Sequence, residues 1–272
     1  KNEGSLLPLA AGTKVAVLGD FAKNPRYQGA GSSMVNSTQV DVLLDKLIDS
    51  ELNVIGYQQG FDRHGKPDAA LQKSACELAT QADTVILCMG LDEIAESEGL
   101  DRSNLRLAQN QVDLLQAVAA VNPKIVVVLY SGSVVETPWL DNCQALLYAA
   151  LGGQAGAGAV ADALTGKVNP SGSLVDTYCY DNFSAPAMWN FTPTTYEGYV
   201  EGGDVSAKAK SYMIYQEGIY VGYKYYETRY EDFVTGNGNA GDYAYGDIVA
   251  YPFGYGMSYT SYDISDMNVN YN

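Results

Sequence analysis

The seven residues TVILCMG (Thr84–Gly90) form an apolar run that ends at a glycine. The run has the length of a strand, and its lack of polar alternation indicates burial on both faces. Four more short runs share this character. They are KVAVLG (Lys14–Gly19), NVIGY (Asn53–Tyr57), KIVVVLYSG (Lys124–Gly132) and QALLYAA (Gln144–Ala150). Strands that are apolar throughout are typical of parallel sheets covered by helices on both sides.

Helical patterns lie between these runs. In STQVDVLLDKLIDS, Ser37 is expected to be the N-cap of a helix. The apolar face of that helix consists of Val40, Leu43, Leu44 and Leu47. Similar patterns occur in DAALQKSACELATQA, in LAQNQVDLLQAVAAVN and in GGQAGAGAVADALTG, which ends with Gly166 at a C-cap position. The alternation of strands and helices predicts an α/β fold, with a mainly parallel sheet sandwiched between helix layers.

The composition changes after about residue 180. Of the 22 tyrosines, 18 lie between Tyr178 and Tyr271, and the helical periodicity disappears. The segment EGIYVGYKYYE (Glu217–Glu227) alternates like a strand. We therefore predict a core over 1–180 and a Tyr-rich extension over 181–272. Tyrosine suits surfaces that are apolar on one side and wet on the other, so the extension is expected to pack on the core.

The charge balance limits the partners. With 32 acidic and 16 basic side chains, the formal net charge is −16 at pH 7. We expect no nucleic acid and no anionic membrane as partner, because binding to phosphate requires clustered lysine and arginine. No apolar run approaches the roughly 20 residues of a membrane helix. The sequence starts at Lys1 without an initiator methionine, which we interpret as a piece of a longer chain.

Cysteine and histidine give no sign of a metal site. The four cysteines are far apart and form no C-x-x-C pair, so free thiols are expected. They are Cys76, Cys88, Cys143 and Cys179. His64, the single histidine, lies in the polar segment FDRHGKPD and cannot build a zinc site without several partners. We expect neither a metal nor a cofactor.

Five carboxylates closely follow TVILCMG. They are Asp92, Glu93, Glu96, Glu98 and Asp101. Because ligands of parallel sheets bind outside the carboxyl ends of the strands, this acidic segment is expected at a binding edge. The segment DFAKNPRYQGAGSSMVNS (20–37), which follows KVAVLG, is expected at the same edge. Its QGAGSS lacks the third glycine of a dinucleotide-binding motif, which argues against nucleotide binding.

Six segments of the chain occur in the order found in glycoside hydrolase family 3. They are LLPL, VAVLGDFAKNPRYQGAGSSMVN, ESEGLDRSNLRL, GGQAGAGAVADALTGKVNPSGSL, YQEGIYVGYKYYE and YPFGYGMSYTSY. From Lys1 to about Tyr262, the chain resembles the α/β-sandwich domain of that family. The resemblance implies a (β/α)8 barrel with an aspartate nucleophile, and a fibronectin-like domain towards which the extension leads. No counterpart of the barrel's Asp-Trp motif occurs in this sequence. Ala155 and Ala108 stand where family members often have Glu and Pro.

The resemblance also implies roles for single residues. Ser97–Arg102 matches the family motif S-E-G-x-D-R, so Glu98 is the candidate general acid/base. A retaining glycosidase needs two carboxyl groups about 5–5.5 Å apart, one as nucleophile and one as proton donor. Neighbouring carboxylates are expected to raise the pKa of Glu98. Arg102 is expected to pair with Asp101, and the remaining acidic side chains of the segment are expected to be solvated.

Gly31 and Ser32 are the candidate substrate-binding residues. Ser32 aligns with a family serine that reaches a hydroxyl of the bound sugar, whereas a plain glycine turn is the alternative. Two functions stay open at this point. One is a β-glucosidase domain that needs its barrel for activity and acts on a β-linked glucoside or oligosaccharide. The other is a non-catalytic carbohydrate-binding or interaction module with the same fold.

Overall fold

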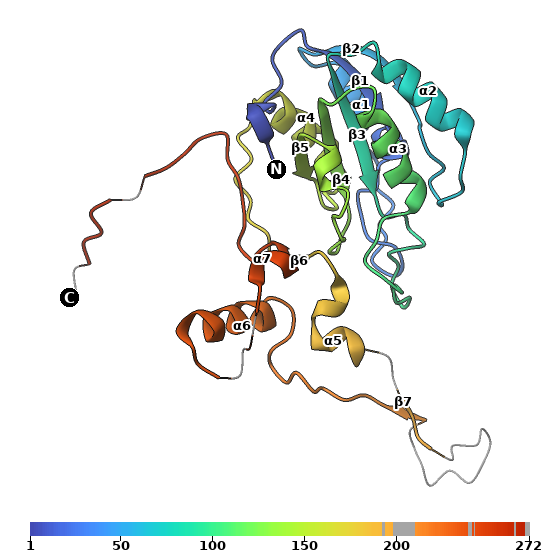
Figure 1. Ribbon diagram of the computed structural model, residues 1–272. Helices are drawn as coiled ribbons and strands as arrows, with labels where there is room; N and C mark the ends of the chain where they lie inside the picture. Colours follow the sequence, from blue (N-terminus) through green and yellow to red (C-terminus); the bar gives the residue numbers. More distant parts are fainter. Residues whose placement is uncertain (192–193, 198–209, 239–240, 242, 264, 270–272) are drawn as a thin grey trace.

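In the computed structural model, five strands form one parallel sheet in the order β2-β1-β3-β4-β5 (Figure 1). They are β1 (Lys14–Leu18), β2 (Asn53–Gln58), β3 (Thr84–Gly90), β4 (Ile125–Tyr130) and β5 (Ala145–Tyr148). The structure describes residues 1–191, 194–197, 210–238, 241, 243–263 and 265–269. All five strands fall within the predicted apolar runs or one residue beyond them, and the predicted α/β fold is confirmed.

The core of the sheet lies at its centre. Every residue of β3 and β4 is buried, because helices cover both faces of these two strands. The two strands pair in continuous register from Val85 with Ile125 to Gly90 with Tyr130. At Gly90 the strands approach closely, since a Cβ there would lie 2.1 Å from the carbonyl oxygen of Tyr130. A glycine at the end of β3 therefore meets a packing requirement.

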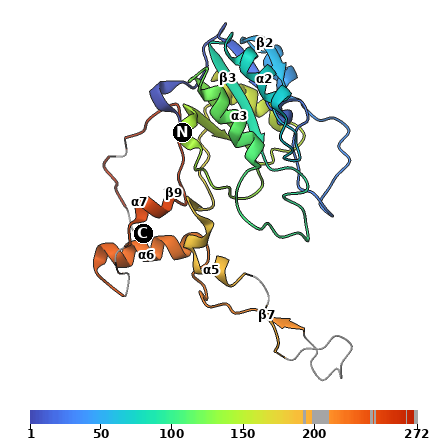
Figure 2. The ribbon, with the colours of Figure 1, turned by 45° about the vertical axis from the view of Figure 1, so that its right-hand side comes forward.

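Four helices form the two outer layers. They are α1 (Leu43–Ile48), α2 (Ala69–Ala79), α3 (Gln109–Ala119) and α4 (Gly156–Thr165). On one face α2 lies beside α3, and on the other α1 lies beside α4 (Figures 1 and 2). The Asp68 side chain caps α2 by accepting hydrogen bonds from the amides of Ala70 and Leu71. Gly166 ends α4 in the left-handed conformation, as predicted.

The predicted start of the first helix was wrong. Ser37 caps nothing, and α1 begins six residues later at Leu43 with Val42 in the N-cap position. The segment before it bonds to another loop instead, since the amide of Asp41 donates to the carbonyl oxygen of Gln154 at 2.8 Å. A long-range backbone bond therefore replaces the first turns of the predicted helix.

The remaining elements are short. The 3-10 helices are η1 (Glu3–Ser5), η2 (Asp20–Ala22), η3 (Leu140–Asn142) and η4 (Asn182–Ser184). After α4 the structure has β6 (Tyr178–Cys179), α5 (Pro186–Trp189), β7 (Thr194–Thr195), β8 (Ser211–Tyr212), α6 (Tyr223–Thr235), α7 (Tyr245–Ile248) and β9 (Val249–Tyr251). Strands β6 and β9 pair antiparallel, as do β7 and β8.

Strand β6 and the extension together form a second, small core below the sheet (Figure 1). Its buried members are Cys179, Ala185, Tyr226 and Val249. Tyr178, Tyr251 and Tyr259 pack on the main core instead. The division of the chain near residue 180 stays a prediction, and parts of 181–272 lie outside the described residues.

The predicted strand within EGIYVGYKYYE was wrong, because its second half begins helix α6 at Tyr223. Helical geometry buries Tyr226 against the small core and leaves Tyr230 and Phe233 exposed. The helix ends at Gly236, whose φ of 67° is left-handed. The apolar alternation in this segment is only a few residues long, so tertiary packing overrode it.

Candidate functional site

The strand order places two loops at one point of the sheet. The order reverses between β1 and β3, and ligands of open parallel sheets bind outside the carboxyl ends of the strands at such a point. The loop after β1 spans residues 19–42, and the loop after β3 spans residues 91–108. Both extend from the same end of the sheet in Figures 1 and 2. These are the two loops that carry the predicted site residues.

The two loops are joined directly. Ala30 and Ser97 form a parallel bridge, and the amide of Glu98 donates to the carbonyl oxygen of Ala30 at 3.0 Å. The amide of Ser32 donates to Glu98 Oε2 at 2.6 Å, and the Ser32 hydroxyl donates to the same oxygen. The structure thus brings Glu98 and Ser32 together on an exposed surface.

Gly31 is in contact with Glu98 as well. Its φ is +109°, and a Cβ built on it would lie 2.5 Å from Glu98 Cβ and 2.8 Å from Glu98 Oε2. Only a residue without a side chain allows this approach. All three predicted site residues therefore meet at one place.

The expected pKa shift of Glu98 was wrong in direction. The hydrogen bonds from the hydroxyl and the amide of Ser32 lower the pKa of the Glu98 carboxyl, because both bonds favour the charged form. Neighbouring carboxylates do not raise it, since Asp92, Glu93 and Glu96 are engaged with other partners. Their expected solvation was also wrong, and each holds part of the site together.

Asp92 shapes the turn before Glu98. It is buried, and its carboxylate accepts the amides of Ile94 at 3.1 Å and Ala95 at 2.7 Å. His64 Nδ1 lies 2.7 Å from its other oxygen. Burial favours the neutral form of Asp92, yet the bonds from Ala95, His64 and Ile94 outweigh it and lower the pKa. His64 is therefore a loop residue that contacts an acid beside the site.

Arg63 connects three loops. Its guanidinium contacts Asp20 Oδ2 and Glu93 Oε1 at 2.5 Å each, and it donates to the carbonyl oxygen of Asn24 at 3.0 Å. It also lies over the ring of Phe21, 4.5 Å from the centroid. Burial raises the pKa of Glu93, but the bond and the charge of Arg63 outweigh it, so the pKa is lowered. The start of the loop after β3 is thus tied to the segments that follow β1 and β2.

Glu96 fixes the other side of the same loop. Its carboxylate accepts the amide of Gly132 at 2.9 Å and the hydroxyl of Ser133 at 2.5 Å, both from the segment after β4. A second contact runs to Arg26, whose Nη2 lies 3.5 Å from Glu96 Oε2. Sequence reasoning missed the roles of Glu96 and Arg26. A charged side chain in a loop gives no local signal of a partner far away in the sequence.

The expected pairing of Arg102 with Asp101 was wrong. Arg102 Nη1 donates to the hydroxyl of Ser133 at 3.0 Å and to the carbonyl oxygen of Val134 at 2.9 Å. Asp101 points to solvent. The end of the motif is therefore anchored to the segment after β4 rather than to its own aspartate.

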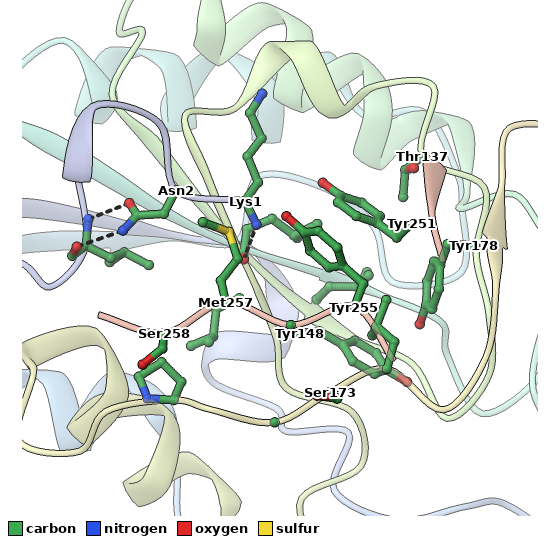
Figure 3. Close-up of a pocket in the computed structure, with 18 of the residues that line it drawn as sticks. Lys1, Asn2, Thr137, Tyr148, Ser173, Tyr178, Tyr251, Tyr255, Met257 and Ser258 are labelled. Carbon is green, nitrogen blue, oxygen red and sulfur yellow. Dashed lines mark hydrogen bonds between the residues drawn. The ribbon is translucent and has the colours of Figure 1, made fainter. Parts of the chain in front are cut away.

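A cavity lined largely by tyrosines lies away from these residues. It has a volume of about 280 Å³ and lies between β5 and the segment 249–259 (Figure 3). Tyrosine rings form much of its wall, namely Tyr148, Tyr178, Tyr251, Tyr255 and Tyr259. Gly31, Ser32 and Glu98 do not line it. The candidate site is an open surface rather than a closed pocket.

Metal and membrane features are absent from the part of the chain that the structure describes. No group of three or more His, Cys, Asp or Glu side chains in it could hold a metal ion. The four cysteines are free thiols. Across the same residues, no helix is long and apolar enough to cross a membrane.

Comparison with known proteins gives consistent matches. The family model described as "Glycosyl hydrolase family 3 C-terminal domain" matches residues 1–223. An exo-α-(1→6)-L-arabinopyranosidase from Bifidobacterium longum is 38% identical over 280 residues, which cover 99% of this chain and 33% of that protein. Thermostable β-glucosidase B from Acetivibrio thermocellus is 36% identical over 274 residues, 99% of this chain and 32% of that protein.

A solved structure agrees with these matches. The crystal structure of a family 3 β-glucosidase from Bifidobacterium adolescentis superposes with a TM-score of 0.77 at 40% identity. The superposition covers 96% of this chain and 34% of that one. The chain thus spans about a third of the length of these similar proteins.

Proposed function

This chain belongs to glycoside hydrolase family 3, whose C-terminal domain it matches, and we propose that it supplies Glu98 as the general acid/base of a retaining β-glycosidase. One observation carries the proposal. Glu98 is the carboxylate of the β3 loop that faces solvent beside a serine hydroxyl and a glycine, at the topological switch point of the sheet. Asp92, Glu93 and Glu96 are bound within the fold and are poor candidates for contact with a substrate.

The proposed chemistry needs a second carboxylate. Glu98 protonates the glycosidic oxygen while a nucleophile on the opposite face of the sugar attacks the anomeric carbon. Glu98 then takes a proton from the water that releases the sugar. The nucleophile comes from the remainder of the polypeptide, the (β/α)8 barrel that we propose lies outside these 272 residues. The fibronectin-like domain is proposed to follow the extension.

We propose a β-linked glucoside or oligosaccharide as the substrate. Two similar proteins are named for a β-glucosidase and for an α-L-arabinopyranosidase activity. The glycosidic bond of a β-glucoside and that of an α-L-arabinopyranoside are both equatorial at the anomeric carbon, so one arrangement of two carboxylates can serve either sugar. The surface on this chain contributes Ser32 and Gly31 to the sugar site, and the remaining contacts come from the barrel.

Ser32 and Glu98 are coupled in this proposal. With the Ser32 hydroxyl bound to it, Glu98 favours the charged form, which cannot donate a proton. A sugar hydroxyl that accepts the hydrogen bond of the Ser32 hydroxyl removes one of the two hydrogen bonds between Ser32 and Glu98. Closure of the barrel over the site removes water from the carboxyl and adds a second negative charge nearby. Each change raises the pKa of Glu98 towards that of a proton donor.

Kinetics of the complete enzyme test the proposal. In Glu98→Ala, hydrolysis of alkyl β-glucosides is expected to fall by about 10²–10⁴-fold, because their leaving groups need a proton. Dinitrophenyl β-glucoside is expected to form the glycosyl-enzyme still, and azide to accelerate turnover by attacking it and yielding the β-glucosyl azide. Asp101→Ala is the matched control, since Asp101 is exposed on the same loop. Near-normal hydrolysis of alkyl glucosides by Glu98→Ala would favour the non-catalytic module instead.

A further inference from the structure

Arg26 is a buried cation between the two loops of the site. It belongs to the loop after β1, only 2% of it is exposed, and it is among the largest fully buried side chains. Burial of a charge is costly unless the group is well bonded. The hydrogen-bond partners of Arg26 therefore indicate which segments of the fold this side chain holds together.

The guanidinium reaches across to the loop that carries Glu98. Nη1 donates to the carbonyl oxygens of Leu91 and Asp92, both at 2.7 Å, and Nη2 donates to that of Glu96 at 3.0 Å. The Glu96 carboxylate lies 3.5 Å from Nη2. One side chain thus holds three backbone carbonyls of the loop after β3. The nearest of them, that of Glu96, lies two residues before Glu98.

The same guanidinium fixes its own loop. Nε donates to the carbonyl oxygen of Gln28 at 3.1 Å. The Gln28 amide group closes this loop by accepting the amide of Val35 at 2.9 Å and donating to its carbonyl oxygen at 3.1 Å. Gly31 and Ser32 lie within the closed segment. Arg26 therefore sets the position of Ser32 on one side and of Glu98 on the other.

The bonding pattern requires arginine. Its planar guanidinium presents donors in a rigid fork, so one group can bond to carbonyls on two loops at once. A lysine ammonium carries three donors at one point and cannot span the same set of acceptors. The charge is retained in Arg26→Lys while the geometry is lost.

We propose that Arg26 is a positioning residue, which holds the loops of Glu98 and Ser32 in the places where Glu98 can reach the glycosidic oxygen of a bound glycoside. This inference rests on the proposed function of Glu98. Displacement of a catalytic group by about 1 Å can cost about 10²-fold in rate. The effect of losing Arg26 is therefore expected on the step that uses the proton of Glu98.

The test compares two substrates in the complete enzyme. The value of kcat/KM is measured for an alkyl β-glucoside, whose departure needs a proton, and for dinitrophenyl β-glucoside, whose departure does not. In Arg26→Lys, the alkyl glucoside is expected to lose about 10-fold or more relative to the dinitrophenyl glucoside. Adding Arg26→Lys to Glu98→Ala is expected to change this ratio no further, because both act on the same proton.

A core variant separates positioning from stability. Val118 on α3 is fully buried away from the site, so Val118→Ala lowers the melting temperature without altering the loops. Its ratio of the two kcat/KM values is expected to equal that of the wild type. If Arg26→Lys lowers both substrates equally, as a merely less stable enzyme would, the inference is overturned.

A second variant covers the case in which Arg26→Lys gives no folded enzyme. Gln28→Ala removes the clamp on Val35 and loosens the same loop at a half-buried position. It is expected to show the same selective loss on the alkyl glucoside, and an unchanged ratio overturns the inference. If Glu98→Ala itself leaves the ratio unchanged, the proposed function fails, which is a different outcome from failure of Arg26 alone.

Discussion

Ser32 donates two hydrogen bonds to a single oxygen of Glu98, one from its amide at 2.6 Å and one from its hydroxyl. The two residues are 66 positions apart in the sequence and come from loops after different strands. The contact makes the ionisation of Glu98 depend on Ser32. It also makes the candidate site a property of two loops, not of one motif.

The first prediction concerns this contact. Ser32→Ala removes the hydroxyl and keeps the amide, so the lowered pKa of Glu98 is expected to rise towards its ordinary value of 4.5. A carboxyl whose pKa is lowered by folding stabilises the fold at pH values above its pKa in the unfolded chain. This contribution is lost as the pH falls through its pKa in the folded protein. Titration of the ¹³C-labelled glutamates by NMR measures the shift. Ser33→Ala, at an exposed neighbouring position, is expected to leave the pKa of Glu98 unchanged.

The second prediction concerns Gly31. In Gly31→Ala the new Cβ meets the Glu98 side chain at 2.5 Å, so Glu98 must move and activity of the complete enzyme is expected to fall about 10-fold or more. Gly12→Ala is the control, because Gly12 also has a positive φ of 77° but nothing within 4 Å of a Cβ. Both variants carry backbone strain of about 1–3 kcal/mol. Equal activity in the two variants would contradict the close contact with Glu98.

The third prediction concerns the ionic contacts of Arg63. Arg63→Met leaves buried Asp20 without its cationic partner and with only the Asn24 amide bonded to it, which is expected to lower the free energy of unfolding by about 1–3 kcal/mol at pH 7. The pKa of Glu93 is lowered in the folded protein, so its contribution to stability is fully present above the ordinary value of 4.5 and is lost progressively as the pH falls from there through the lowered value. The difference between variant and wild type is therefore expected to shrink at pH 3.5.

Urea unfolding at the two pH values measures this difference. Lys73→Met is the control, since its pair with Glu77 is exposed on one helix and is worth only a few tenths of a kcal/mol. A pH-independent cost of Arg63→Met would show that the Arg63 charge contributes nothing and that its packing on Phe21 accounts for the loss.

The fourth prediction concerns the 272 residues alone. They offer a proton donor without the proposed nucleophile, so the purified chain is expected to hydrolyse no aryl β-glucoside, including the dinitrophenyl compound. Release of dinitrophenol is followed by absorbance, with the complete enzyme as the positive control. Turnover that survives repeated purification and is lost in Glu98→Ala would mean that this chain holds a nucleophile of its own.

The sequence by itself determined the elements whose pattern is local. TVILCMG became β3 with the predicted bounds, and Gly166 ended α4, because burial on both faces and a left-handed C-cap constrain the residues at those positions directly. The resemblance to a known family pointed to Gly31, Ser32 and Glu98, and the parallel strand order implied a shared edge for both loops.

Only the tertiary structure decided how the loop charges are used. Arg26 bonds to Leu91 across 65 positions and Glu96 to Ser133 across 37, and no local pattern encodes which carbonyl or hydroxyl will lie opposite a charged side chain. The same holds for α6, where burial of Tyr226 against Cys179 and Val249 overrode a short alternation. Hydrogen bonds and burial between distant segments depend on how the chain closes on itself, and this closure lowers the pKa of Glu98 through the hydrogen bonds from Ser32.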